Sequence, residues 1–148
     1  MASQMYDYGR KTVNQRGDWV VGNYNVLLVD SAYSIDVAAH KFVSDVVGHE
    51  ISTTNYARQA LASKTSTVDT TAHKCHFGAN NNTWSALGTS TGGPTAAGAI
   101  IYWEPSSSPT DATRELVAFI DFPDQTLAGV NFTIEWNSGA SSGTIFDL

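Results

Sequence analysis

The feature that most constrains this chain is a two-residue alternation of apolar and polar side chains. In residues 130–136, valine, phenylalanine, isoleucine and tryptophan alternate with Asn131, Thr133 and Glu135. In residues 114–122, the same period places Leu116, Ala118 and Ile120 on one face and Val117, Phe119 and Asp121 on the other. Successive side chains of a β-strand point to opposite faces, whereas a helical face repeats about every 3.6 residues. The alternation therefore predicts a half-buried strand at 130–136 and a further strand at 114–122.

A second kind of strand is predicted at residues 25–30, Asn-Val-Leu-Leu-Val-Asp, where a continuous apolar run indicates a strand covered on both faces. Further strands are predicted at 55–62, 66–69, 74–78, 84–87 and 96–104, with a strand or turn at 18–21. Loops are predicted at 88–95 and 105–111, and a turn at 123–129. Seven to nine short strands at this spacing predict a mainly β fold, a single-domain β-sandwich or jelly roll over residues 1–148.

One or two short helices are expected beside the strands. Residues 6–15 have helical spacing that Gly9 weakens, and residues 41–47 place apolar side chains one turn apart before Gly48. The segment Gly48–Leu61 is then expected to run from a helix end, through a polar turn, into the strand at 55–62. Residues 1–5 are expected to form a flexible arm and residues 139–148 a flexible tail.

Composition narrows the classes of function. Only 15% of the 148 residues are charged and the net charge is −6, which argues against a basic face for nucleic acid. No apolar run approaches the roughly 20 residues of a membrane-spanning helix, and residues 1–8 lack the features of a signal peptide. The single cysteine, Cys75, excludes an intramolecular disulfide and fits synthesis in a reducing cytoplasm.

No catalytic, cofactor-binding or metal-binding residue is predicted. In the cluster His73-Lys74-Cys75-His76, a strand would turn Cys75 and His76 to opposite faces, so they cannot act together as ligands or as nucleophile and base. Asp121 and Asp124 are too few for a calcium site, and no Gly-x-Ser-x-Gly motif occurs. The chain is therefore not expected to be an enzyme.

The four tryptophans leave a sugar-binding alternative open, because aromatic faces can stack on sugar rings. Trp84, Trp103 and Trp136 lie in strand patterns and are expected in the core, while the position of Trp19 is less determined.

Several segments in order resemble a family of small virion structural proteins of tailed bacteriophages. They are residues 25–33, 40–46, 50–61, 83–87, 116–122 and 131–136, and the similarity extends over about residues 5–137. The most specific parts are Tyr-Ala-Arg-Gln at 56–59 and Thr-Trp-Ser-Ala-Leu at 83–87. The resemblance implies a capsid decoration (cement) protein that binds the major capsid protein on the outside of the shell. The alternative is a receptor- or carbohydrate-binding module of the tail or a fibre.

For a decoration protein we expect a homotrimer made in the host bacterial cytoplasm, with no nucleic-acid or membrane partner. The loop at residues 88–94 and the tail at residues 139–148 are rich in glycine, serine and threonine and match no motif of the family. Together with the arm at residues 1–5, they are the segments most free to contact a partner. The candidate contact residues are Met1, Ala2, Ser3, Gln4, Gly92, Gly93, Pro94, Ser141, Ser142 and Phe146.

Overall fold

The computed structural model of the protein describes residues 2–16, 18–136 and 144–148. The strands in these residues are β1 (Ala2–Met5), β2 (Tyr24–Asp30), β3 (Gln59–Ala60), β4 (Thr65–Asp69), β5 (Lys74–Gly78), β6 (Asn82–Gly88), β7 (Thr95–Trp103), β8 (Glu115–Thr126), β9 (Ala128–Ile134) and β10 (Thr144–Asp147). The helical segments are α1 (Asp7–Gln15) and two 3-10 turns, η1 (Val43–Asp45) and η2 (Val47–His49). The predicted mainly β, sandwich-like class is confirmed.

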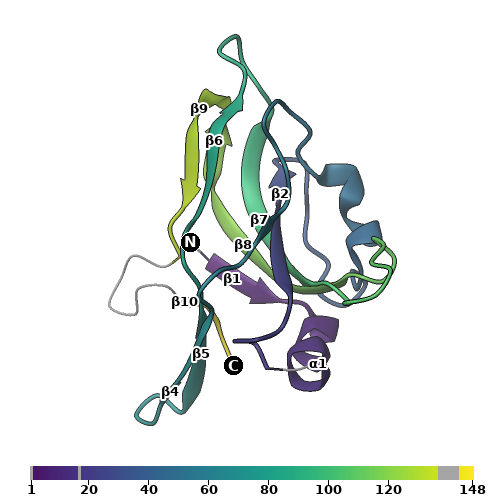
Figure 1. Ribbon diagram of the computed structural model, residues 1–148, viewed down its shortest axis with the longest axis vertical. Helices are drawn as coiled ribbons and strands as arrows, with labels where there is room; N and C mark the ends of the chain where they lie inside the picture. Colours follow the sequence, from purple (N-terminus) through teal and green to yellow (C-terminus); the bar gives the residue numbers. More distant parts are fainter. Residues whose placement is uncertain (1, 17, 137–143) are drawn as a thin grey trace.

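The strands form one large antiparallel sheet and two small ones (Figure 1). The large sheet has the order β1-β8-β7-β2-β3, and the small sheets are β10-β5-β4 and β6-β9. The small sheets lie along one face of the large sheet, while η1, η2 and the long connections around them lie along the other. The N-terminal strand β1 is therefore an edge of the large sheet, whereas the C-terminal strand β10 belongs to a small one.

Strand β2 is buried on both faces, as its apolar run predicts. Val26 and Leu28 belong to the larger hydrophobic cluster, which also contains side chains of the small sheets such as Trp84. Leu27 and Val29 belong to the second cluster, on the opposite face. This division follows from the period of two, because neighbouring residues of a strand point to opposite sides.

Helix α1 packs against β8 at a β-bulge. The register between β7 and β8 shifts between Ile101 and Tyr102, so Val117 is an extra residue on β8. The Val117 carbonyl accepts a hydrogen bond of 3.1 Å from the Tyr6 N–H, and a Cβ at Gly9 would overlap this carbonyl. Gly9 thus lets the helix approach the strand closely, which accounts for a residue that weakens the helix by propensity.

Three sequence predictions of local structure need correction. Residues 41–47 form η1 and the start of η2 instead of one α-helix, and only Gln59 and Ala60 of the predicted strand 55–62 pair with β2. The turn predicted at 123–129 is largely strand, because β8 continues to Thr126 and β9 begins at Ala128. Pro123 falls in a stretch where the β7–β8 register shifts, so its missing N–H costs no regular ladder bond.

The two ends of the chain also differ from the flexible segments expected. Ala2–Met5 pair with β8 as β1, and Thr144–Asp147 pair with β5 as β10. In β10, Ile145 and Phe146 are buried, so apolar packing fixes the C-terminal strand. Met1 and residues 139–143 of the expected tail lie outside the described residues. Among the residues described, no helix has the length and apolar character needed to cross a membrane.

The contact between α1 and β8 gives a direct test of the packing. Gly9→Ala should lower the free energy of unfolding by about 2 kcal/mol, because the new methyl group overpacks against a backbone carbonyl. This loss should appear although alanine gains roughly 1 kcal/mol of helix propensity over glycine. Urea denaturation of both proteins measures the difference.

The matched control is Gly48→Ala, since an added Cβ there meets nothing within 4 Å. Its free energy of unfolding should stay within about 0.5 kcal/mol of the original. Equal stability of the Gly9 and Gly48 variants would contradict the close approach of α1 to Val117.

Candidate binding surfaces

The predicted contact residues of the N-terminus lie on an exposed strand. Ala2, Ser3 and Gln4 are exposed on β1, and β1 contacts β10 near the other end of the chain. Ser3 and residues of β10 line a small cavity of about 130 Å³. The fold therefore brings the N-terminal contact candidates beside the C-terminal strand.

Of the C-terminal contact candidates Ser141, Ser142 and Phe146, the structure describes only Phe146, which is not on this surface. Phe146 is only 2% exposed, with its ring stacked on Phe77 at 5.1 Å and at an edge angle to Trp19 at 5.2 Å. The prediction of Phe146 as a contact residue is therefore wrong, because the side chain belongs to the core. Ser141 and Ser142, like Met1, lie outside the described residues.

The loop candidates form a separate surface at one end of the molecule (Figure 1). Gly92 has φ +102° in a turn where its N–H donates to the Thr89 carbonyl at 3.3 Å. The Pro94 carbonyl accepts from the Leu127 N–H at 3.0 Å, and a Cβ at Gly93 would overlap the Leu127 carbonyl. The loop 89–94 is thus held against the β8–β9 connection at its base, while its tip is exposed.

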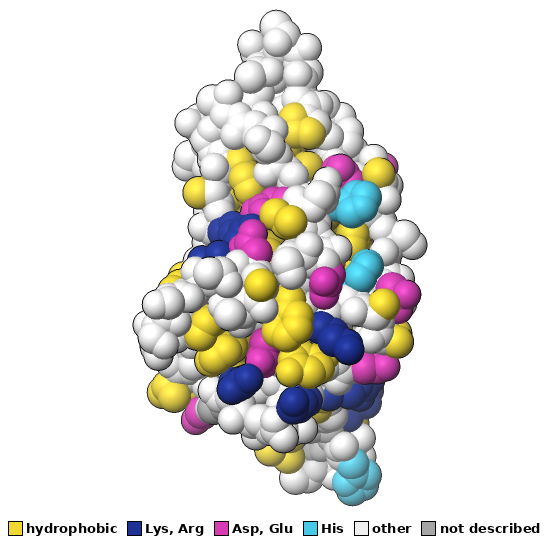
Figure 2. Space-filling model, turned by 90° about the vertical axis from the view of Figure 1, so that its right-hand side faces the viewer, with side chains coloured by type: hydrophobic (Ala, Val, Ile, Leu, Met, Phe, Trp, Pro, Cys, Tyr) yellow, Lys and Arg dark blue, Asp and Glu magenta, His cyan; other side chains and the backbone are white. Residues whose placement is uncertain are grey.

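A third surface, not predicted from the sequence, is an aromatic groove of about 340 Å³. It lies between α1, η1, the start of β8 and the β7–β8 loop, and Figure 2 views the molecule from this side, with hydrophobic side chains gathered next to Lys and Arg. Its lining residues are Tyr8, Arg16, Phe42, Trp103, Pro105, Ala112, Thr113 and Glu115. The Tyr8 and Phe42 rings lie 5.6 Å apart, and the Arg16 guanidinium lies over the Trp103 ring at 5.2 Å.

A buried carboxylate fixes the floor of the aromatic groove. Glu115 is 3% exposed and accepts a hydrogen bond of 2.7 Å from Thr12 Oγ1. Arg16 donates to the same carboxylate from Nε and from Nη2, the latter at 2.7 Å. Hydrogen bonding to Glu115 raises the pKa of Arg16. The carboxylate is already satisfied by the protein, so the aromatic rings are the part of the groove open to a ligand.

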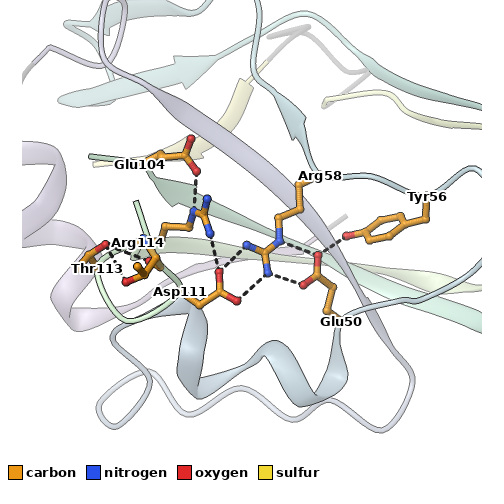
Figure 3. A network of polar contacts seen from close by, with 8 residues as sticks. Glu50, Tyr56, Arg58, Glu104, Asp111, Thr113 and Arg114 are labelled. Carbon is orange, nitrogen blue, oxygen red and sulfur yellow. Dashed lines mark hydrogen bonds and ion pairs between the residues drawn. The ribbon is translucent and has the colours of Figure 1, made fainter. Parts of the chain in front are cut away.

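A network of ion pairs lies beside Thr113, a residue that also lines the aromatic groove (Figure 3). Arg58 contacts Glu50 at 2.6 Å and Asp111 at 2.6 Å, and Arg114 joins Asp111 at 2.8 Å to Glu104 at 2.6 Å. The Arg58 guanidinium lowers the pKa of Asp111, and the bonds to Glu50 raise the pKa of Arg58. All these side chains are at most about a third exposed.

The network has a structural role rather than the geometry of a reaction site. It ties the connection before β3 to the β7–β8 loop, and Tyr56 extends it by donating to Glu50 at 2.9 Å. Each arginine faces two carboxylates, so the five charges largely neutralise one another. Removing one member of such a partly buried set would leave its partners uncompensated.

The residues of the cluster His73–His76 lie on the β4–β5 hairpin, where they have different surroundings. His73 lies in the turn with φ +54°, Cys75 is half-buried, and His76 Nδ1 contacts Asp147 at 2.7 Å. His76 Nε2 also lies 3.7 Å from Asp69. Within the described part of the chain, no group of three or more His, Cys, Asp or Glu has a metal-binding arrangement.

The tryptophans divide between core and surface. Trp19, Trp84 and Trp136 are each 2% exposed, whereas Trp103 is only partly buried in the aromatic groove. The core position is therefore confirmed for Trp84 and Trp136 and wrong in part for Trp103. The groove was missed because its residues are distant in sequence, although Tyr8, Thr12 and Arg16 recur at the four-residue spacing of one helical face.

Comparisons with protein families, curated proteins and solved structures found no significant match for this chain.

The contacts of His76 predict a pH dependence at the C-terminal strand. The hydrogen bond to Asp147 raises the pKa of His76, with Asp69 adding to the effect, while Lys74 lies 3.7 Å from Asp147. A raised pKa means that the folded state favours protonated His76. This stabilisation is complete below the ordinary histidine pKa of about 6.5 and is lost as the pH rises through the raised value.

Protection of the β10 amides against hydrogen exchange, corrected for intrinsic rates, should therefore be greater near pH 6 than near pH 8, values on either side of the histidine range. NMR exchange measured on Ile145–Asp147 checks this, and His76→Gln should remove the dependence. Protection that increases with pH, or that changes equally in the glutamine variant, would show that the His76 pair does not hold β10.

Proposed function

We propose that this chain is a structural protein of a bacteriophage virion, without enzymatic activity. It acts as a capsid decoration protein that binds the lattice of the major capsid protein from the outside. The observation that supports this role best is the contrast between internally paired charges and exposed polar segments. Arg58, Arg114 and Arg16 are each paired with carboxylates of the same molecule.

Such a surface suits a large protein–protein interface. Charged residues are depleted at interface cores, since each must lose its hydration on contact. The exposed parts of β1 and of the loop 89–94 offer Ala, Ser, Gln, Thr and Gly instead. A protein that binds only the assembled lattice stabilises the shell by mass action, without any chemical step.

The two surfaces that carry the candidate contacts can be tested separately. Ser3→Arg on β1 and Thr91→Arg in the loop 89–94 each add a charge at an exposed site. We expect at least one of them to weaken binding to purified capsid shells tenfold or more, because a charge buried without a partner costs more than the roughly 1.4 kcal/mol of a tenfold change. Co-sedimentation with shells measures bound copies.

Ser107→Arg, in the exposed loop between β7 and β8, is the control and should bind normally. Thermal melting should be unchanged in all three variants. Absence of binding by the unmodified protein, or equal binding by all variants, would contradict the proposed attachment surfaces.

A second function, receptor or carbohydrate binding in the tail or a fibre, is favoured by the aromatic groove. Trp103 is the tryptophan that is not buried, and it lies with Tyr8 and Phe42 around one concave surface. Aromatic side chains combine apolar faces with polar edges, which suits a sugar ring. Trp19, the other sequence candidate for sugar stacking, is excluded because it packs in the core.

Glycan-array binding tests this second function. If the aromatic groove binds sugar, Trp103→Ala and Phe42→Ala should each lower the affinity roughly tenfold or more, since a central aromatic contact is worth about 2 kcal/mol. Phe132→Ala, which removes a partly buried ring on β9 away from the groove, is the matched control. Absence of glycan binding, or an equal loss in the control, would reject carbohydrate binding at this groove.

A further inference from the structure

Strand β4 forms an exposed edge at the end of the molecule opposite the loop 89–94 (Figure 1). It is the outer strand of the sheet β10-β5-β4, and residues 65–68 are all exposed. Val68 is 70% exposed, which is high for a β-branched apolar side chain in a strand. Edge strands present unpaired backbone donors and acceptors that another strand can complete.

The pairing inside the sheet identifies the unpaired backbone groups. Cys75 and Leu148 exchange two backbone hydrogen bonds, of 2.7 and 3.0 Å. The N–H and carbonyl of Cys75 therefore point toward the end of the chain that contains β10, away from β4. Because backbone groups alternate in direction along a strand, His76 and its alternate neighbours face β4 instead. His76 is opposite Thr67, and the register of β4 and β5 has no shift. The N–H and carbonyl groups of Ser66 and Val68 therefore point outward along the free edge.

The other sheet edges in the described part of the chain have the features that discourage strand pairing. β3 has only two residues, and β1 lies against β10. The β6–β9 pair contains register shifts, and β10 has a shift in its pairing with β5. β4 has a regular register and contains no lysine, proline or bulge, the usual protections of an edge.

An apolar row also reaches this edge. Val68 is opposite Cys75, and Cys75 is opposite Leu148, so the three side chains form a row across the small sheet. Val68 and Leu148 are exposed, at 70% and 36%. The neighbouring row, which starts at Ser66 and continues through Phe77, is covered by Trp19. Adding a strand at β4 would extend both rows and cover Val68.

We propose that the β4 edge binds β4 of a second copy of this chain, antiparallel, about a two-fold axis at Thr67. In this register Ser66 of each copy is opposite Val68 of the other, so the outward backbone groups of both copies form four hydrogen bonds. The two small sheets become one sheet of six strands. Each Val68 lies beside Ser66 of the second copy, next to the row that contains Phe77.

Charge supports this occupant. Asp69 is the charged residue of β4, and the two-fold register places it opposite Thr65 of the second copy, not opposite another carboxylate. Lys74 is opposite Asp69 in the β4–β5 register, so a cation of the same subunit lies on the face of the sheet that carries Asp69. The contact is isologous and closes at two subunits, so it differs from the homotrimer expected from the resemblance.

Sedimentation velocity over a wide concentration range tests this contact independently of any capsid binding. One short strand pair buries less than a standard interface, so we expect a reversible monomer–dimer equilibrium between about 10 μM and 1 mM. Val68→Lys should weaken the association at least tenfold by placing a charge on the edge. Val130→Lys, at a valine of β9 that is 65% exposed, is the matched control and should leave it unchanged.

Hydrogen exchange gives a second readout. The Ser66 and Val68 amides should gain protection as the concentration rises, while the Thr67 amide, already bonded to β5, should not change. A monomer at all concentrations, a trimer, or an equal effect of the two lysine variants would overturn the proposal.

Discussion

The structure depends on burying both faces of the central strands β2, β7 and β8. Each of these strands has apolar side chains pointing to both sides, and a fully buried valine, leucine or isoleucine contributes roughly 1.5–3 kcal/mol. The rest of the chain must supply two covers for one sheet. The small sheets with Trp19 cover one face, and Tyr6, Val43 and Val46 cover the other. The C-terminal strand β10 adds Ile145 and Phe146 to the first cover, whereas β1 extends the sheet itself and buries Met5 in the same cluster.

Charged residues hold the connections over the second face of the sheet in place, outside the apolar contacts. The connections over the second face have little secondary structure, and their positions are held by Arg58 and Arg114 between three carboxylates. Exposed ion pairs stabilise little, but these side chains are mostly shielded and share partners, so their loss leaves charges without compensation. The same arrangement pairs Arg58 and Arg114 with carboxylates of their own molecule, and this internal pairing is the property on which the proposed binding role rests.

The sequence predicted the elements whose structure depends on local pattern. The alternation at 114–122 and 130–136, the apolar run of β2 and the helical spacing of α1 all correspond to the observed elements. Prediction failed where contacts with residues distant in sequence determine the conformation of a segment or the burial of a side chain. Residues 55–58 alternate like a strand, yet Trp84 Nε1 donates to the Ala57 carbonyl at 2.7 Å and the Leu28 N–H donates to Tyr56 at 3.0 Å, so side chains hold this segment instead of a ladder. Phe146 lies near the chain end, and only its packing on Phe77 and Trp19 places it in the core.

The surfaces left after folding are unequal, and this difference bears on assembly. The loop 89–94 and the β4–β5 hairpin lie at opposite ends of the molecule, whereas β1 lies between them (Figure 1). A two-fold pairing of β4 would therefore leave both loops and both β1 strands of the pair free. Loop contacts rely on exposed side chains and tolerate varied partners, while a regular strand edge requires a partner with extended backbone in register. The geometry thus separates a surface suited to self-association from surfaces suited to a different protein.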